Sequence, residues 1–291
     1  MIGWLIYSKP DAIKNKRYID FYMEEGKLLN IDISLILVED LNFGINDNKW
    51  FIELKNQTVK SPDFVICRTI YPLLNKQFEL MGIRVFNNSM VADICNDKAK
   101  TYQYVAKLGI KVVDTIFCRN DLLQLKLNSL KEPTVVKAVA GHGGSQVFLI
   151  DPNDTTIVER KKQEIIDGID KSDVVIQPLT GNKHQDLRVY VLGKQIIAAI
   201  LRTANEGFKS NFSLGGDVKR YELSPEETNT VMKIVHSLDF DLVGIDFIIG
   251  DQGELIFNEI EDVVGARMLY QCTDINLVRV YLNYIKTHIL A

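Results

Sequence analysis

The sequence predicts a folded α/β protein of about two domains, and three observations support this. The chain has 291 residues, about twice a typical domain of roughly 150 residues. Hydrophobic residues make up 46% of it and charged residues 25%, the balance of an ordinary globular protein. Short β-branched runs alternate with segments whose apolar residues recur at helical spacing, which is typical of mixed helix and sheet.

Composition argues against several classes of protein. Lysine and arginine number 34 against 38 aspartates and glutamates, so the net charge is −4 and the chain lacks the basic footprint of nucleic-acid binding. The four cysteines form no Cys-x-x-Cys pair and no histidine stands at ligand spacing, as expected for reduced thiols. No apolar run approaches the roughly 20 residues that cross a bilayer, and no export signal is found. We expect a cytoplasmic protein without nucleic-acid or membrane partners.

The first two thirds predict two compact α/β units. Strands are expected at residues 2–7, 33–38 and 64–67 with a helix over 12–29, in a small domain that ends near residue 90. In the middle third, helices are expected over about 97–108 and 154–167, and strands at 115–118, 134–138, 147–150 and 174–177.

The last third predicts two hairpins and two helices. The first hairpin covers residues 186–202 and the second covers 242–260. Between them, Ser224 stands as a helix N-cap before a proline and a glutamate at N3, which is a strong helix start. A final helix is expected from about residue 276.

Three carboxylates on the second hairpin suggest a metal site. A tight turn places Asp246 opposite Phe257, and alternation puts Glu259 and Glu261 on the face of Asp246. Such carboxylates repel one another unless a cation lies among them, and oxygen ligands alone favour Mg²⁺ over zinc. The alternative is a solvated outer face of the hairpin.

A glycine-rich turn at residues 141–145 follows the strand that contains Lys137. Such a turn can bring backbone N–H groups against phosphate oxygens, although it is neither a P-loop nor the dinucleotide fingerprint. Lys137 lies in an otherwise apolar strand, where an unpaired ammonium is costly and a bound phosphate would compensate it. The alternatives are an ordinary turn, and a lysine that pairs with a carboxylate or reaches solvent.

Two arginines lie on the arms of the first hairpin. A two-residue turn at Gly193 and Lys194 would place Arg188 and Arg202 on opposite faces, whereas a three-residue turn that includes Leu192 would place them on the same side. We favour convergence, because two guanidiniums beside carboxylates suit a polyanion bridged to metal. The alternative for each arginine is a surface ion pair.

Together these segments resemble the ATP-grasp superfamily, specifically the RimK-like ligases that join amino acids to carboxylates. The resemblance covers essentially the whole chain and rests on seven motifs in order: Asp97-Lys98 opening a helix, Val-Val-Lys137, Val-Ile-Gln177-Pro-Leu, Asp186-Leu-Arg188-Val, the stretch from Arg202 to Gly216, Gly-Ile-Asp246-Phe and Phe-Asn-Glu259. It implies an ATP-grasp fold, α/β and α+β, that begins with a small N-terminal parallel α/β domain (1–90). A central subdomain with the glycine-rich loop (91–180) and a C-terminal subdomain with the metal and substrate site (181–291) follow, and these two subdomains enclose the nucleotide.

The resemblance also implies roles for particular residues. Those expected at ATP are Lys98, Lys137, Gly141, His142, Gly143, Gly144, Ser145, Gln177, Pro178, Leu179 and Asp186. Those expected at Mg²⁺, as two ions or with Mn²⁺ as a substitute, are Asp246, Glu259 and Glu261. Arg188, Arg202 and Asn211 are expected at the γ-phosphate and acyl intermediate, and Arg68, Lys209 and Arg267 are candidates for substrate contact.

The sequence departs from the family after Glu259. These ligases usually have Glu-x-Asn followed by Ser-Pro-Gly, whereas this chain has Glu261 at the asparagine position and Gly265-Ala-Arg267 beyond it. A third carboxylate would make a metal site more anionic; alternatively, Glu261 pairs with Arg267. The glycine loop also has Gln146 where a glycine is common.

The expected activity is an ATP-dependent carboxylate–amine ligase that forms an acyl phosphate, then an amide, and releases ADP. Its expected partners are small-molecule or peptide carboxylates and amines, with a homodimer plausible. The main alternative is an ATP-binding sensor or partner subunit without turnover. A dehydrogenase built on the first domain has little support, because Gly3 lacks a glycine fingerprint around it.

Overall fold

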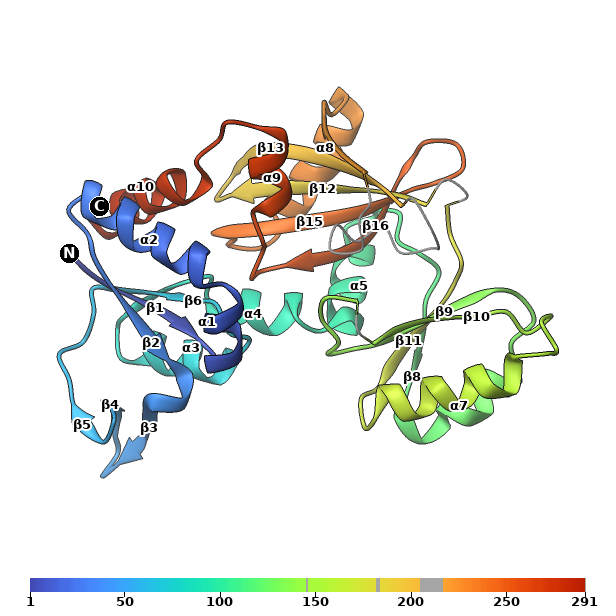
Figure 1. The fold of residues 1–291 in the computed structure, drawn as a ribbon, viewed down its shortest axis with the longest axis horizontal. Coiled ribbons are helices and arrows are strands. Elements are labelled where there is room, and N and C mark those ends of the chain that lie inside the picture. The colour runs from blue at the N-terminus through green and yellow to red at the C-terminus, as the bar shows by residue number, and fades with distance from the viewer. Residues whose placement is uncertain (145, 182–183, 205–216, 291) are drawn as a thin grey trace.

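The structure, a computed structural model, describes residues 1–144, 146–181, 184–204 and 217–290. Figure 1 shows an N-terminal domain at one end, a central sheet at the other, and a C-terminal sheet that lies above and between them. Both termini lie at the N-terminal domain. No helix among the described residues is of the length and apolarity that a membrane span requires.

The N-terminal domain is built on a parallel sheet in the order β2-β1-β6-β7. Its strands are β1 (Ile2–Tyr7), β2 (Asp32–Leu37), β6 (Phe64–Cys67) and β7 (Arg84–Phe86), and its helices are α1 (Lys9–Lys14), α2 (Lys16–Leu28), α3 (Pro72–Leu80) and α4 (Ser89–Cys95). The helix predicted over 12–29 is divided at Asn15, whose side chain donates to the Asp11 carbonyl at 2.9 Å. Asparagine competes with helix continuation through such bonds.

This domain also carries an antiparallel sheet that the predicted elements do not include. It consists of β3 (Leu41–Asn46), β4 (Lys49–Leu54) and β5 (Gln57–Thr58), after a 3₁₀ turn at Val38–Asp40. The β3–β4 turn is Asp47-Asn48, with φ angles of 48° and 59°. Aspartate and asparagine adopt positive φ more readily than other non-glycine residues, so this dipeptide is the sequence signal for the hairpin.

The central sheet has the order β10-β9-β11-β8 and is antiparallel. Its strands are β8 (Ile116–Cys118), β9 (Thr134–Ala138), β10 (Val147–Ile150) and β11 (Val174–Pro178), with a 3₁₀ turn at Asn120–Leu122 and helices α6 (Leu123–Asn128) and α7 (Val158–Ile169). The preceding helix α5 (Lys98–Lys107) packs against α4 and against β16 (Leu255–Glu261) of the C-terminal sheet. Its Tyr102 and Val105 are buried in one cluster with Phe257.

The C-terminal sheet has the order β14-β13-β12-β15-β16. Its strands are β12 (Gln185–Leu192), β13 (Gln195–Thr203), β14 (Asp217–Tyr221), β15 (Leu242–Ile249) and β16 (Leu255–Glu261), and the helices are α8 (Pro225–Val235), α9 (Arg267–Cys272) and α10 (Leu277–Leu290). The expected start of α8 is confirmed, because Ser224 and Glu227 form a reciprocal capping box.

Two β-bulges give the hairpins registers that differ from those expected. In the first hairpin the turn has two residues, but the register shifts after Tyr190, so Arg188 faces Ile200 and Arg202 faces Asp186. The arginines therefore converge as expected, through a bulge and not through a three-residue turn. In the second hairpin the register shifts after Asp246, which consequently lies opposite Glu259 and not opposite Phe257.

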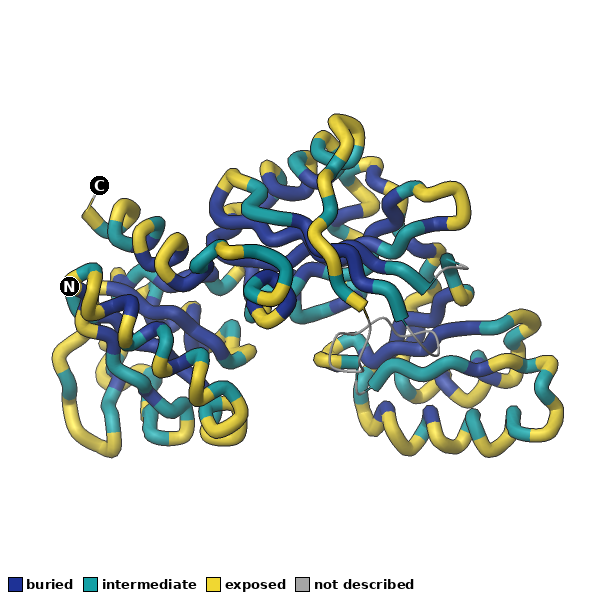
Figure 2. The backbone as a smooth tube through the Cα atoms, turned by 45° about the horizontal axis from the view of Figure 1, so that its top comes forward, coloured by how far each residue is buried: buried dark blue, intermediate teal, exposed yellow. Residues whose placement is uncertain are grey.

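The C-terminal sheet packs on both faces. One face meets α5 and α8. The other shares a cluster with α10 and the N-terminal domain that includes Tyr190, Tyr281 and Leu5. Figure 2 shows long buried stretches through the C-terminal sheet, where β12 and β15 are buried along most of their length, while much of the surface of α7 is exposed. Helix α10 lies against α2, where Arg279 and Glu25 form a 2.7 Å ion pair, so the end of the chain joins the two regions.

Candidate active site

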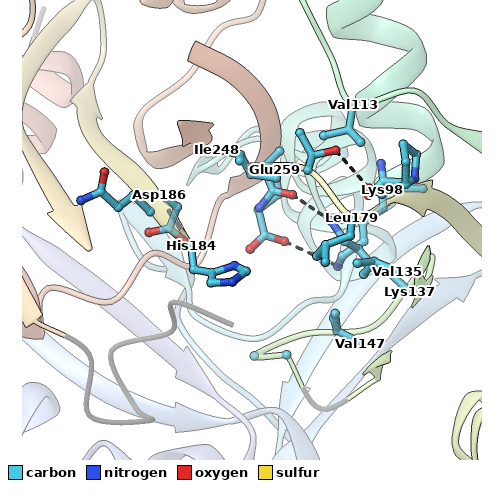
Figure 3. Close-up of a pocket in the computed structure, with 17 residues that line it drawn as sticks. Lys98, Val113, Val135, Lys137, Val147, Leu179, His184, Asp186, Ile248 and Glu259 are labelled. Carbon is cyan, nitrogen blue, oxygen red and sulfur yellow. Dashed lines mark hydrogen bonds and ion pairs between the residues drawn. The ribbon is translucent and has the colours of Figure 1, made fainter. Parts of the chain in front are cut away.

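A pocket lies between the central sheet and the C-terminal sheet (Figure 3). Strands β9, β10 and β11 line one side, and β12, β15 and β16 line the other. The lining residues are Lys98, Val113, Val135, Lys137, Gly143, Gly144, Val147, Gln177, Pro178, Leu179, Thr180, His184, Gln185, Asp186, Ile248, Asn258 and Glu259. Nine of the expected site residues are thus brought to one cavity, with apolar side chains on its wall.

Two buried lysines carry positive charge into this pocket. The Lys137 ammonium donates to Asn258 Oδ1 at 2.8 Å, and the Lys98 ammonium donates to the Gly141 carbonyl and lies 3.6 Å from Glu259. Burial lowers the pKa of Lys137 to about 8; Glu259 opposes this effect and Lys98 adds to it. Two cations beside one carboxylate leave a positive excess that a bound anion would balance.

The glycine-rich loop contributes backbone to the same cavity. Gly143 and Gly144 line the pocket with φ angles of +62° and +75°, a conformation that favours glycine. Gly141 is buried and His142 is exposed, and neither lines the pocket. Ser145 lies outside the described residues.

Three further residues expected at ATP lie in or directly after β11, on the same side of the pocket as β9 and β10. Gln177, Pro178 and Leu179 all line the pocket. The Gln177 amide donates to Thr115 Oγ1 at 2.8 Å, and the Leu179 N–H donates to the Pro133 carbonyl at 3.0 Å. These bonds hold the segment as a fixed edge that a flat heterocycle could lie against.

Beyond Glu259, a row of alternating charges crosses the C-terminal sheet. Arg202 donates to both oxygens of Asp186 and, at 2.8 Å, to Asp246. Arg188 donates to both oxygens of Asp246 at 2.7 Å and reaches Glu261 at 2.8 Å. We call these five residues the charge ladder. Its arginines hold the pKa of Asp246 at about 2, against a raising effect of burial.

The ladder bears on the expected metal site. Both Asp246 oxygens already accept hydrogen bonds from guanidiniums, and Glu261 is paired with Arg188. The described residues contain no group of three or more histidine, cysteine or acidic side chains placed to hold a metal ion. The donor chemistry suits Mg²⁺, but the ligands as placed do not form its site. The cations that lie among these carboxylates in the structure are Arg188, Arg202 and, at Glu259, Lys98.

Among the lining residues that were not expected, Asn258 contacts one of the buried lysines. Simple alternation places Asn258 on the face opposite Glu259, away from the pocket. The bulge in β16 instead places Asn258 at the pocket, where its side chain accepts from Lys137 and, at 3.4 Å, from the Tyr102 hydroxyl. The only sequence signal is a polar residue within an apolar strand.

The candidates for substrate contact lie apart. Arg68 is buried at the junction of the N-terminal domain and the loop after β16, where it donates to the Val264 carbonyl at 3.0 Å. Arg267 is exposed at the start of α9, and Glu261 pairs with Arg188 rather than with it. Lys209 and Asn211 lie outside the described residues.

A parallel N-terminal domain followed by two sheets that hold a lysine-lined pocket is the architecture of ATP-grasp proteins. The RimK-like ATP-grasp domain family matches residues 95–285, and the chain belongs to this family. In fold, the chain is similar to a RimK domain ATP-grasp protein from Sphaerobacter thermophilus, with a TM-score of 0.74 at 14% identity and 98% and 99% of the two chains covered.

Curated relatives match along most of the chain. An uncharacterised protein from Mycoplasma genitalium is 28% identical over 282 residues, which is 96% of this chain and 90% of that protein. A protein named probable alpha-L-glutamate ligase 1 from Shewanella sp. MR-4 is 27% identical over 267 residues, which is 88% of this chain and 87% of that protein.

Proposed function

We propose that this protein is an ATP-dependent ligase that forms an amide bond between a carboxylate and an amine, one of which belongs to an amino acid. ATP is the expected nucleotide, and the reaction would release ADP and phosphate. The observation that carries the proposal is the pair of buried lysines, Lys98 and Lys137, in a pocket between two sheets of an ATP-grasp chain. The name of the Shewanella relative makes glutamate the first amino acid to test.

The pocket would offer partners to the phosphates and to the base of ATP. Lys98 and Lys137 would bind the phosphates together with the N–H groups of the glycine loop, because their charge exceeds that of the nearby carboxylate. The apolar wall formed by Val113, Val135 and Ile248 would take the base.

The chemistry then needs no side-chain nucleophile. A substrate carboxylate oxygen would attack the γ-phosphorus, the bond to the β-phosphate would break, and an acyl phosphate and ADP would form. The amine nitrogen would attack the acyl carbon, phosphate would leave, and the nitrogen would lose a proton to give the amide. The protein would contribute positioning and neutralisation of charge, as in other phosphoryl transfers.

Arg188 and Arg202 would take part in that neutralisation. Each is buried and held rigidly by carboxylates, so its orientation is set before a ligand arrives. ATP-grasp ligases in general use divalent metal ions. In this chain, Asp246 would have to release an arginine to bind one, so we assign the metal no ligand set and derive no step through it.

The test is a phosphate-release assay with ATP, Mg²⁺ and pairs of amino acids, dipeptides and small carboxylates, followed by mass spectrometry of the products. We expect ADP, phosphate and a product joined by loss of water for at least one pair. Binding of ATP without release of phosphate for any pair would contradict the ligase and favour an ATP-binding sensor or partner subunit.

A further inference from the structure

Asn258 is the extra residue of the bulge in β16. Asp246 lies opposite Glu259 and Phe247 lies opposite Phe257, so Asn258 has no partner residue in β15. Phe247 and Phe257 are both fully buried, and their rings meet edge to face with centroids 6.1 Å apart, which fixes the backbone beside the bulge. Bulges next to active sites re-aim side chains. This one places the side chain of Asn258 at the wall of the pocket.

The amide oxygen of Asn258 holds the Lys137 ammonium without neutralising it. The Lys137 ammonium donates to Asn258 Oδ1 at 2.8 Å, and the Tyr102 hydroxyl donates to the same oxygen at 3.4 Å. Two donors at one oxygen set the orientation of the amide. Among the described residues, Asn258 is the hydrogen-bond acceptor of the Lys137 ammonium, and no ion pair includes this lysine.

A carboxylate in place of this amide would change the charge of the pocket. The charged groups that act on Lys137 are Glu259 and Lys98, which shift its pKa in opposite directions. With a neutral residue 258, these three side chains carry one excess positive charge that an anion can use. An aspartate would form an ion pair with Lys137 and cancel that charge, although it has nearly the shape of asparagine.

We propose that Asn258 is a positioning residue for the nucleotide: its neutral amide holds Lys137 at the pocket wall and leaves the charge of the lysine to a phosphate. This inference rests on the proposed function, in which Lys137 binds ATP phosphates. It requires that residue 258 accept a hydrogen bond and carry no charge. A change that strengthens the contact to the lysine should therefore weaken nucleotide binding, which is the reverse of what a purely structural role predicts.

Asn258→Asp in the full-length protein tests this requirement. The new ion pair gives a buried ammonium a negative partner, so the melting temperature of the ligand-free protein should rise by about 2–4 °C. The affinity for a non-hydrolysable ATP analogue, measured by titration calorimetry at pH 7, should fall by about 10- to 100-fold. Asn46→Asp is the matched control, because it adds the same charge at the exposed end of β3 and should leave the affinity unchanged.

Proton uptake on binding gives a second readout, which a structural role would not move. The pKa of Lys137 is about 8, so at pH 8 binding of the analogue should take up about 0.5 proton at this lysine. In Asn258→Asp the lysine is already protonated at this pH, and the uptake should fall close to zero. In Asn258→Leu the ammonium loses its acceptor and is neutral more often, so the uptake should approach one proton. Asn258→Leu carries the test if Asn258→Asp does not fold.

The outcomes separate this inference from the proposed function. Unchanged affinity in Asn258→Asp, a fall of both its affinity and its melting temperature, or wild-type proton uptake in either variant would overturn the role of Asn258. A wild type that binds no analogue, or that binds it no better than Lys137→Met, would overturn the nucleotide pocket and the role of Asn258 with it. Binding that depends on Asn258, without phosphate release for any substrate pair, would overturn the ligase alone.

Discussion

Replacement of Lys137 by methionine tests the nucleotide pocket most directly. Burial lowers the pKa of Lys137 from 10.5 to about 8. At 1.36 kcal/mol for each pH unit, the buried ammonium costs the folded protein about 3 kcal/mol at neutral pH. Between pH 8 and 10.5 the folded protein binds fewer protons than the unfolded chain, so the stability of the ligand-free protein should rise with pH across this window. Lys137→Met should remove that rise and retain the fold.

Phosphate binding should reverse the lowered pKa. If ATP phosphates contact the ammonium, the protonated form is favoured again, so at pH 9 binding should take up about 0.9 proton at Lys137, and at pH 7 only about 0.1. ATP affinity should accordingly fall as the pH rises above 8. At pH 7, Lys137→Met should lose one charge-assisted contact, which is about 10- to 100-fold in affinity.

Titration calorimetry at pH 9 in two buffers of different ionisation enthalpy measures the proton uptake. Lys194→Met is the control, because Lys194 lies at the β12–β13 turn and not in the pocket. Equal proton uptake by wild type and Lys137→Met, or unchanged affinity at pH 7, would refute the placement of phosphates at this lysine.

Three further predictions concern the charges and the local structure. Glu259→Gln should lower the melting temperature of the ligand-free protein, because Glu259 is the carboxylate that offsets the charge of Lys98 and Lys137; an unchanged melting temperature would contradict that role. Asp246→Asn should destabilise the protein more than Glu261→Gln, because it removes the shared partner of both arginines; denaturant melts decide the order. Ser224→Ala should cost about 1 kcal/mol through loss of the helix cap, and an unchanged denaturation midpoint would contradict this.

The local elements follow from the sequence alone. The start of α8 is predicted because Ser224 and Glu227 cap the helix through bonds within one turn of the chain. Strands β9 and β10 are predicted at their observed bounds from short apolar runs bordered by glycine and polar residues. The family also follows from the order of the motifs along the chain, and its match over residues 95–285 confirms that resemblance.

The registers and charge pairs are decided only by the tertiary structure. Whether a strand can accommodate an extra residue, as β13 and β16 do, depends on its partner strand and on the core beneath it. Neither the partner strand nor the core can be read from a single segment of the sequence. The bulge in β16 turns Asn258 toward Lys137, although alternation predicts the reverse.

The same reason explains why the sequence predicts a metal site where the structure has ion pairs. The sequence shows three carboxylates and two arginines on separate hairpins, but not which charge meets which. Pairing of β12 with β15 sets Arg188 beside Asp246, and the bulge in the first hairpin brings Arg202 to the same carboxylate. The sequence alone determined that these charged groups would gather. Which charges pair depends on positions that strands distant in the sequence impose, so the packing of the strands decided that the arginines pair with Asp246.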